Sequence, residues 1–143
     1  MDKNMVKYVN LIGVRSDLEE RINQIYKFYA EFCSYEIKDI FISEYLKEDG
    51  SREFESLWLF SDKYYMEAKN FTKTEEYDAA LINNNIIKWD IKKEKYDFVK
   101  AHKDSRLNVG VITESTSCNL KASGENCDQL RDIFIKYVIT NMK

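Results

Sequence analysis

The last third of the chain constrains the fold most, because two strand-like runs lead there into one amphipathic helix. In Arg106–Ile112 and Cys118–Ala122 apolar residues alternate with polar ones, which indicates half-buried strands. The helix is expected to begin near Asn126, which forms a capping-box pattern with Gln129. Apolar residues at spacings of three and four define its buried face: Leu130, Ile133, Phe134, Tyr137 and Val138. This order predicts a sheet closed off by a C-terminal helix.

A second helix is predicted near the start of the chain. Ser16-Asp17-Leu18-Glu19 is another capping-box pattern. The residues that follow place one apolar face on a helix that is expected to end near residues 34–36: Leu18, Ile22, Ile25, Tyr29 and Phe32. The preceding segment, Met5–Val14, is apolar and is compatible with either a strand or a helix.

From about residue 37 the apolar period changes from the helical value to two, which predicts an antiparallel meander. Its strands are expected at Asp39–Leu46, Glu53–Phe60 and Tyr64–Ala68, with Asp49-Gly50 as a hairpin turn between the first two. Alternation on the second strand assigns Phe54, Trp58 and Phe60 to one face, and Leu57 and Leu59 to the other.

The middle of the chain is less regular. Thr72–Asn85 is acidic and is expected to be a loop, with a short helical turn at Tyr77–Ile82 as one alternative. Ile87, Trp89 and Ile91 alternate with charged residues, and Lys93-Glu94 is expected to turn the chain into a further strand at Tyr96–Phe98.

These segments together predict the α+β class: an N-terminal helix, then about seven antiparallel strands that form a barrel or sandwich capped by the C-terminal helix. We expect a single domain over residues 1–143, with 1–36 as a helical segment and 37–143 as the β-structure plus the final helix. A hydrophobic fraction of 44% in 143 residues is ample for one core.

Charge and targeting patterns narrow the ligand classes. The net charge of −3 argues against a general binder of nucleic acid or anionic membranes, which normally has a basic excess. No apolar run approaches the roughly 20 residues of a membrane-spanning helix, and the N-terminus has no secretory leader pattern, so a cytoplasmic location is expected. Cys33, Cys118 and Cys127 fit neither a disulfide framework nor a zinc pair and are interpreted as buried thiols.

The segment from about Asp39 to Met142 resembles the pleckstrin-homology-like (PH-like) fold, most closely over Leu107–Val111, Cys118–Ala122 and Asn126–Met142. In that fold two packed antiparallel sheets form a seven-stranded barrel, and a C-terminal helix plugs one open end. Bacterial members, and small proteins of Bacillus-like bacteria, have similar endings. The resemblance implies a bacterial binding scaffold for peptides or other domains.

The first hairpin loop departs from the lipid-binding members of that family. Those members hold a phosphoinositide headgroup with basic residues in this loop, whereas Glu48-Asp49-Gly50-Ser51 is acidic here. No lipid-binding residues are therefore transferred to this chain, and no membrane partner is expected.

Catalytic patterns are not recognised. The single histidine, His102, has no neighbouring nucleophile in the sequence, and the four glycines do not form a phosphate loop. No His, Cys and carboxylate residues have metal-ligand spacing. We therefore expect no catalytic, cofactor-binding or metal-binding residues and no enzymatic activity. Convergent carboxylates leave a small hydrolase or nuclease as an alternative, although Glu44, Glu53 and Glu55 are interpreted as the solvent side of strands.

A basic segment with interleaved aromatic residues is the one candidate interaction surface in the sequence. Its residues are Lys88, Lys92, Lys93, Lys95, Tyr96 and Arg106. Such a pattern can bind single-stranded nucleic acid weakly, and it is also typical of a solvated hairpin face. The favoured function is a non-enzymatic protein-binding or interaction module whose partner is another protein or its own copy.

Overall fold

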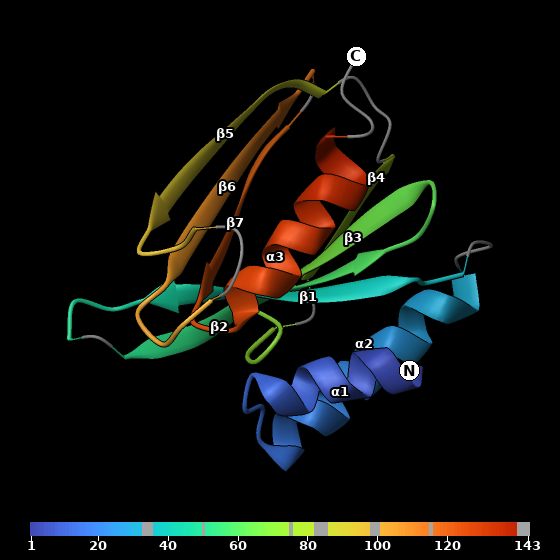
Figure 1. The fold of residues 1–143 in the computed structure, drawn as a ribbon. Coiled ribbons are helices and arrows are strands. Elements are labelled where there is room, and N and C mark those ends of the chain that lie inside the picture. The colour runs from blue at the N-terminus through green and yellow to red at the C-terminus, as the bar shows by residue number, and fades with distance from the viewer. Residues whose placement is uncertain are drawn as a thin grey trace.

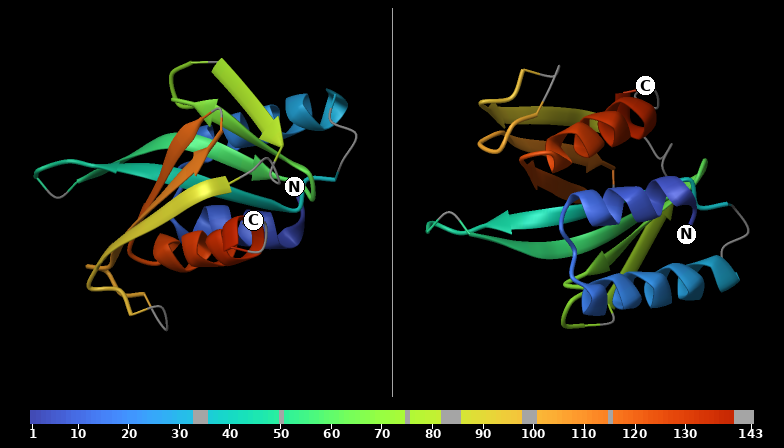
Figure 2. Two further views of the ribbon diagram at one scale, coloured as in Figure 1. Left: turned by 90° about the horizontal axis from the view of Figure 1, so that it is seen from above. Right: turned by 60° about the horizontal axis from the view of Figure 1, so that its bottom comes forward.

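A computed structural model gives the structure of the protein over residues 1–32, 36–49, 51–74, 76–81, 86–97, 101–114 and 116–139. It has the α+β class that the sequence predicts. Figures 1 and 2 show two N-terminal helices on one side of a four-stranded sheet, and a three-stranded sheet with the C-terminal helix on the other side.

The first helix, α1 (Lys3–Leu11), settles the conformation of the ambiguous Met5–Val14 segment. The Asp2 side chain caps it by accepting a hydrogen bond from the backbone N–H of Met5 at 2.9 Å. Gly13 then turns the chain with a φ of 76°, a conformation that glycine adopts without steric cost.

The second helix, α2 (Ser16–Phe32), is the predicted one, and the residues of its apolar face that are fully buried are Ile22, Ile25 and Tyr29. The predicted capping box is wrong, because the N–H of Glu19 bonds to the carbonyl of Arg15 at 2.9 Å. Ser16 is therefore the first helical residue and not the cap.

The first sheet has the strand order β1-β2-β3-β4 and is antiparallel throughout. Its strands are β1 (Asp39–Leu46), β2 (Arg52–Phe60), β3 (Tyr64–Lys69) and β4 (Glu76–Leu81). β4 replaces the loop or helical turn expected at Tyr77–Ile82 over residues 77–81, and Ile82 lies outside the described residues. The acidic side chains of β4 obscure its period of two in the sequence. In the structure Tyr77 stacks on Phe28 of α2 at 5.1 Å, while Asp78 forms an ion pair with Lys69 at 2.6 Å.

The second sheet has the order β5-β6-β7, with β5 (Ile86–Glu94), β6 (Arg106–Thr113) and β7 (Ser117–Ser123). The turn expected at Lys93-Glu94 is wrong, since β5 continues to Glu94 and the chain turns at Lys95, whose φ is 53°. The expected strand at Tyr96–Phe98 is not formed at Tyr96 and Asp97, and Phe98 lies outside the described residues.

The described strands thus form a two-sheet sandwich and not one closed barrel. Side chains join the sheets where β1 lies beside β7. The Ser43 hydroxyl accepts a hydrogen bond from the N–H of Lys121 at 3.1 Å, and the Glu44 carboxylate accepts one from the N–H of Ser123 at 2.6 Å.

The C-terminal helix has the predicted buried face. It comprises α3 (Asn126–Ile133) and a π-helical continuation, η1 (Phe134–Val138). It buries Leu130, Ile133, Phe134 and Tyr137, whereas Val138 is only half-buried. Tyr137 stacks on Phe60 of the first sheet at 4.7 Å, and Phe134 meets Trp89 of the second sheet edge-on at 5.2 Å. The helix therefore fills the space between the two sheets.

Candidate functional site

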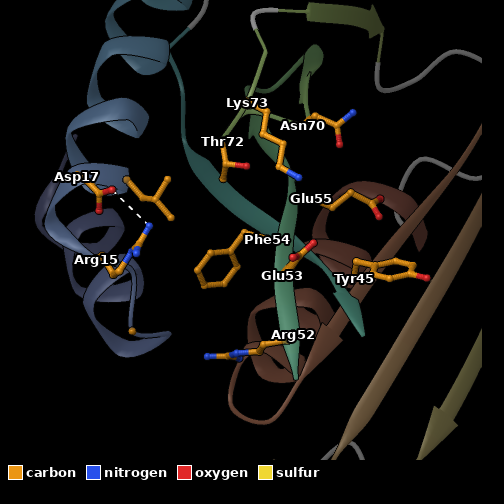
Figure 3. Close-up of a pocket in the computed structure, with 12 residues that line it drawn as sticks. Arg15, Asp17, Tyr45, Arg52, Glu53, Phe54, Glu55, Asn70, Thr72 and Lys73 are labelled. Atoms are coloured by element: carbon orange, nitrogen blue, oxygen red, sulfur yellow. Dashed lines mark hydrogen bonds and ion pairs between the residues drawn. The ribbon is translucent and has the colours of Figure 1, made fainter. Parts of the chain in front are cut away.

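An open groove of about 670 Å³ lies where the α1–α2 turn, β2 and the turn after β3 meet (Figure 3). We call it the Phe54 groove, and it is lined by Gly13, Arg15, Asp17, Leu18, Tyr45, Arg52, Glu53, Phe54, Glu55, Asn70, Thr72 and Lys73. Three segments that are distant in the sequence therefore build one surface.

A β-bulge in the first hairpin aims residues into this groove. Ser43 pairs with Ser56, but the next residue of β1, Glu44, pairs with Phe54, so Glu55 is an extra residue on β2. Bulges of this kind change which face of a strand the following side chains occupy. Phe54 and Arg52 consequently project toward the α1–α2 turn, as Figure 3 shows.

The bulge also corrects the predicted alternation of β2. Phe54 does not share a face with Trp58 and Phe60, which contact Tyr65 on the side of the second sheet. Phe54 is instead half-buried at the floor of the groove, where the Arg52 guanidinium lies 5.7 Å from the centre of its ring.

Charges of both signs line the rim of the groove. Arg15 pairs with Asp17 at 3.3 Å, and Lys47 pairs with Glu53 at 2.7 Å. The Lys47 ammonium holds the pKa of the Glu53 carboxyl below its usual range, and Lys73 adds a smaller effect of the same sign. These side chains are exposed, so their ion pairs exchange readily with those of a ligand.

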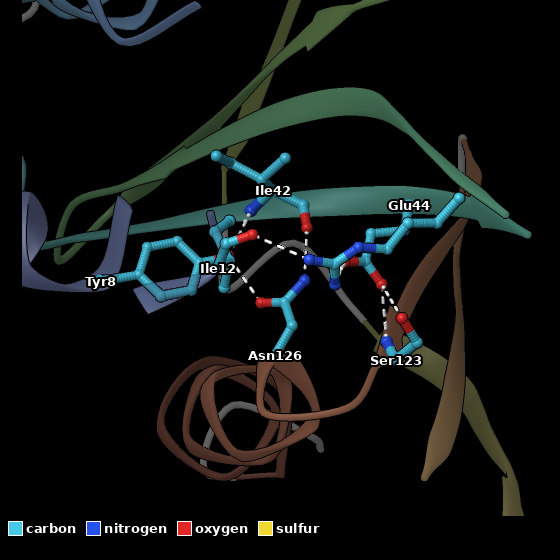
Figure 4. Close-up of polar contacts among 7 residues, drawn as sticks. Tyr8, Ile12, Ile42, Glu44, Ser123 and Asn126 are labelled. Carbon is cyan, nitrogen blue, oxygen red and sulfur yellow. Dashed lines mark hydrogen bonds and ion pairs between the residues drawn. The ribbon is translucent and has the colours of Figure 1, made fainter. Parts of the chain in front are cut away.

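Arg52 is held in place by the fold, unlike the residues of the rim. Its guanidinium donates to the Glu44 carboxylate at 2.6 Å and to the carbonyl of Ile12 at 2.8 Å (Figure 4). Glu44, which was expected on the solvent side of its strand, is fully buried and also accepts from the Ser123 hydroxyl at 2.7 Å. Burial raises the pKa of Glu44, while Ser123 and Arg52 oppose that rise.

A neighbouring polar network closes the edge of β1 (Figure 4). The Tyr8 hydroxyl accepts from the N–H of Ile42 at 2.9 Å and donates to the Asn126 side chain at 2.6 Å, while the Asn126 amide donates to the carbonyl of Ile42 at 2.9 Å. Gln129 donates to the carbonyl of Ile40 at 2.7 Å. The predicted capping box at Asn126 and Gln129 is therefore wrong, because both side chains bind the edge strand instead.

The basic residues predicted as an interaction surface are only partly gathered. Lys88 and Lys92 are exposed on the same face of β5, and Lys93 lies on the opposite face. Arg106 begins β6 opposite Glu94, and it lines a shallow pocket of about 180 Å³ with Lys92 and Lys93.

The aromatic component of that surface is buried. Tyr96 is only 3% exposed, and its hydroxyl contacts the Asp128 carboxylate at 2.9 Å. Its ring therefore packs in the core and presents no stacking face to a nucleotide. Lys95 forms the exposed turn before it.

The described thiols are unreactive in their surroundings. Burial raises the pKa of Cys118 to about 11 and that of Cys127 to about 12. Cys33 lies outside the described residues. His102 is exposed, and its Nδ1 accepts a hydrogen bond from the N–H of Asp104 at 3.3 Å within the same turn.

A second carboxyl with a raised pKa, that of Glu67, lies on β3. Burial raises the pKa of Glu67, which also accepts a hydrogen bond from the Ser56 hydroxyl at 2.7 Å. Within the part of the chain that the structure describes, no group of three or more His, Cys, Asp or Glu side chains could hold a metal ion. Among the same residues, no helix is long and apolar enough to cross a membrane.

A small apolar cavity also lies between the sheets. It has a volume of about 40 Å³ and is lined by residues that include Trp58, Phe60, Tyr65 and Tyr137. Ligand pockets for organic molecules usually have about 300–1,000 Å³. The Phe54 groove, at about 670 Å³, is therefore a better candidate binding site than this cavity.

No family model, curated protein or solved structure matches the chain. The fold and the site alone therefore define its class: an α+β sandwich with an open groove of mixed charge.

Proposed function

We propose that the protein is a non-enzymatic binding module, and that its Phe54 groove receives an extended segment of a protein partner. The observation that carries the proposal is the construction of the groove. A half-buried aromatic ring forms its floor, Arg52 is fixed beside that ring by two hydrogen bonds, and exchangeable charges form its rim.

The composition of the groove favours a peptide over a small organic ligand. Small-molecule sites are mostly enclosed and apolar with a few polar groups, whereas here both walls carry charged side chains. Equal numbers of basic and acidic side chains line the groove: Arg15, Arg52, Lys73, Asp17, Glu53 and Glu55. A partner segment with one apolar anchor, flanked by charges of both signs, complements this arrangement.

The titratable groups support binding rather than acid–base catalysis. Glu53 has a lowered pKa and acts as an ionised partner of Lys47. The carboxyls with raised pKa values, Glu44 and Glu67, accept hydrogen bonds from Ser123 and Ser56 and do not line the groove. Their perturbation follows from their burial in the fold.

The element order supports the PH-like resemblance as part of this proposal. Antiparallel sheets of four and three strands precede one C-terminal helix, and that helix packs between them. We further propose that the protein is bacterial and cytoplasmic and that its partner is a peptide or another domain.

Affinity capture with the immobilised protein tests the proposal. We expect the wild type to retain a reproducible protein partner that is lost with Phe54→Ala and with Lys73→Glu. Removing the ring deletes the apolar floor that contacts the partner's anchor, and reversing Lys73 changes the charge balance of the groove. Mass spectrometry identifies the retained protein.

Lys7→Glu is the matched control, since it makes the same charge change at an exposed position of α1 that does not line the groove. It should retain the partner. Retention that is insensitive to both groove variants, or no reproducible partner with folded wild-type protein, contradicts the proposal.

A further inference from the structure

β5 lies at the edge of its three-stranded sheet, and its other long side faces away from β6 (Figure 1). It spans nine residues, Ile86–Glu94, so it offers a long row of backbone groups for pairing. Exposed edge strands of this length usually carry charged side chains or bulges that prevent pairing with other chains. The charged side chains of β5 therefore determine which strands can pair with it.

Charges of alternating sign follow the exposed face of β5. Lys88, Asp90, Lys92 and Glu94 are all exposed, and within the described chain none of them has an ion-pair partner. Antiparallel pairing of two copies centred on Ile91 places Asp90 opposite Lys92 and Lys88 opposite Glu94, each twice. A shift by one residue in either direction destroys this match.

We propose that two copies of the protein associate through β5 in this register and form a continuous six-stranded sheet. Directly opposite charges of unlike sign stabilise an antiparallel strand pair, and like charges destabilise it. The row of alternating charge therefore selects one partner and one register, which makes β5 a specific homodimer edge and not a generally blocked one.

The opposite face of β5 agrees with the same register. Ile91 of one copy meets Ile91 of the partner subunit at the two-fold axis, and both are half-exposed in the single chain. Trp89, whose ring rests on Phe134, lies beside this contact and is also half-exposed. Pairing buries both side chains further without moving the helix beneath them.

The other edge of the sandwich lacks these features. β4 has six residues and only acidic charges, Glu76 and Asp78, and Asp78 is already paired with Lys69. Because its charges are all acidic, no register of β4 self-pairing places unlike charges opposite each other, so β4 lacks the charge match of β5. β5 belongs to the three-stranded sheet and lines no part of the Phe54 groove, so dimerisation through β5 is independent of binding in that groove.

A charge swap tests the proposal on the 143-residue protein by sedimentation equilibrium. We expect the wild type to approach twice its monomer mass of 17.0 kDa as concentration rises. Lys92→Asp creates two like-charge pairs and should raise the dissociation constant on the order of tenfold. The double variant Asp90→Lys/Lys92→Asp restores unlike pairs and should restore the dimer.

The residues opposite Asp90 and Lys92 on β6 are Gly110 and Asn108, so neither substitution breaks a cross-strand ion pair within one copy. Circular dichroism verifies that both variants fold. A wild type that stays at the monomer mass, a Lys92→Asp variant that dimerises as well as the wild type, or a folded double variant that stays monomeric each overturns the proposal.

Cysteine cross-linking tests the register separately, in a Cys33→Ser background. Opposite Cα atoms in an antiparallel pair are about 4.5–5.5 Å apart, which suits a disulfide, so Ile91→Cys should cross-link under mild oxidation. Lys93→Cys is the control on the same face, because two copies of residue 93 lie about 13 Å apart in this register. Failure of Ile91→Cys to cross-link, or equal cross-linking at residue 93, overturns the register.

Discussion

Tyr8 is the residue through which the first helix binds the sandwich, since its hydroxyl bonds to both Ile42 and Asn126. Tyr8→Phe leaves the buried N–H of Ile42 and the buried side-chain oxygen of Asn126 without this partner. Each such unsatisfied group lowers the stability of the fold by about 1–3 kcal/mol. We therefore expect urea denaturation to show a loss of about 1–3 kcal/mol in the free energy of unfolding.

Tyr26→Phe is the control for that measurement. Tyr26 is only half-buried, so the variant removes a hydroxyl from a partly exposed side chain. Its loss should change the free energy of unfolding by less than about 0.5 kcal/mol. Equal stability of Tyr8→Phe and wild type would show that the Tyr8 hydroxyl does not hold α1 against β1.

Glu67 should give the stability a distinct pH dependence. Burial raises its pKa in the folded protein, so the folded state binds its proton more tightly than the unfolded state does. Between the unfolded and folded pKa values this contribution to stability falls as pH rises. Glu67→Gln removes that fall, and the variant should therefore gain stability relative to wild type as pH rises through this window.

Glu53→Gln should behave in the opposite sense, because Lys47 lowers the pKa of Glu53 in the folded protein. That carboxyl stabilises the fold above its unfolded pKa, and the contribution is lost as pH falls through the folded pKa. Urea denaturation across the acid range measures both variants. A Glu67→Gln difference that does not change with pH contradicts the assigned environment of Glu67.

At the scale of elements, the C-terminal helix contributes most through its buried face. Leu130 is 1% exposed, whereas Ile135 on the same helix is 48% exposed. Leu130→Ala should cost about 2–5 kcal/mol through lost burial and a residual cavity. Ile135→Ala should change the stability by about 0.5 kcal/mol or less. Similar costs for the two substitutions would contradict the placement of the helix between the sheets.

The elements that sequence periodicity predicted well are those with uninterrupted apolar patterns. The faces of α2 and the C-terminal helix recur at helical spacing, and β6 and β7 alternate with a period of two. β4 was missed because its acidic residues obscure the alternation. The capping box predicted at Asn126 was wrong because Asn126 and Gln129 bind a strand more than 80 residues away, and a local sequence pattern contains no information on such contacts.

At the scale of the molecule, the groove was not predictable from local patterns. It needs the bulge at Glu55, which turns Phe54 toward α2, and it needs the α1–α2 turn to meet the turn after β3. Both conditions depend on long-range packing. The predicted basic surface was visible in the sequence, but the burial of Tyr96 depends on its contact with Asp128 in α3.

Amide hydrogen exchange of the protein, with and without its captured partner, tests the proposed binding function most directly. Occupation of the Phe54 groove predicts slower amide exchange at residues 52–55 of β2 and at residues 72–73 of the turn after β3, with little change at β6. Unchanged exchange at residues 52–55 and 72–73, with protection at another surface, would contradict the assignment of the groove as the binding site.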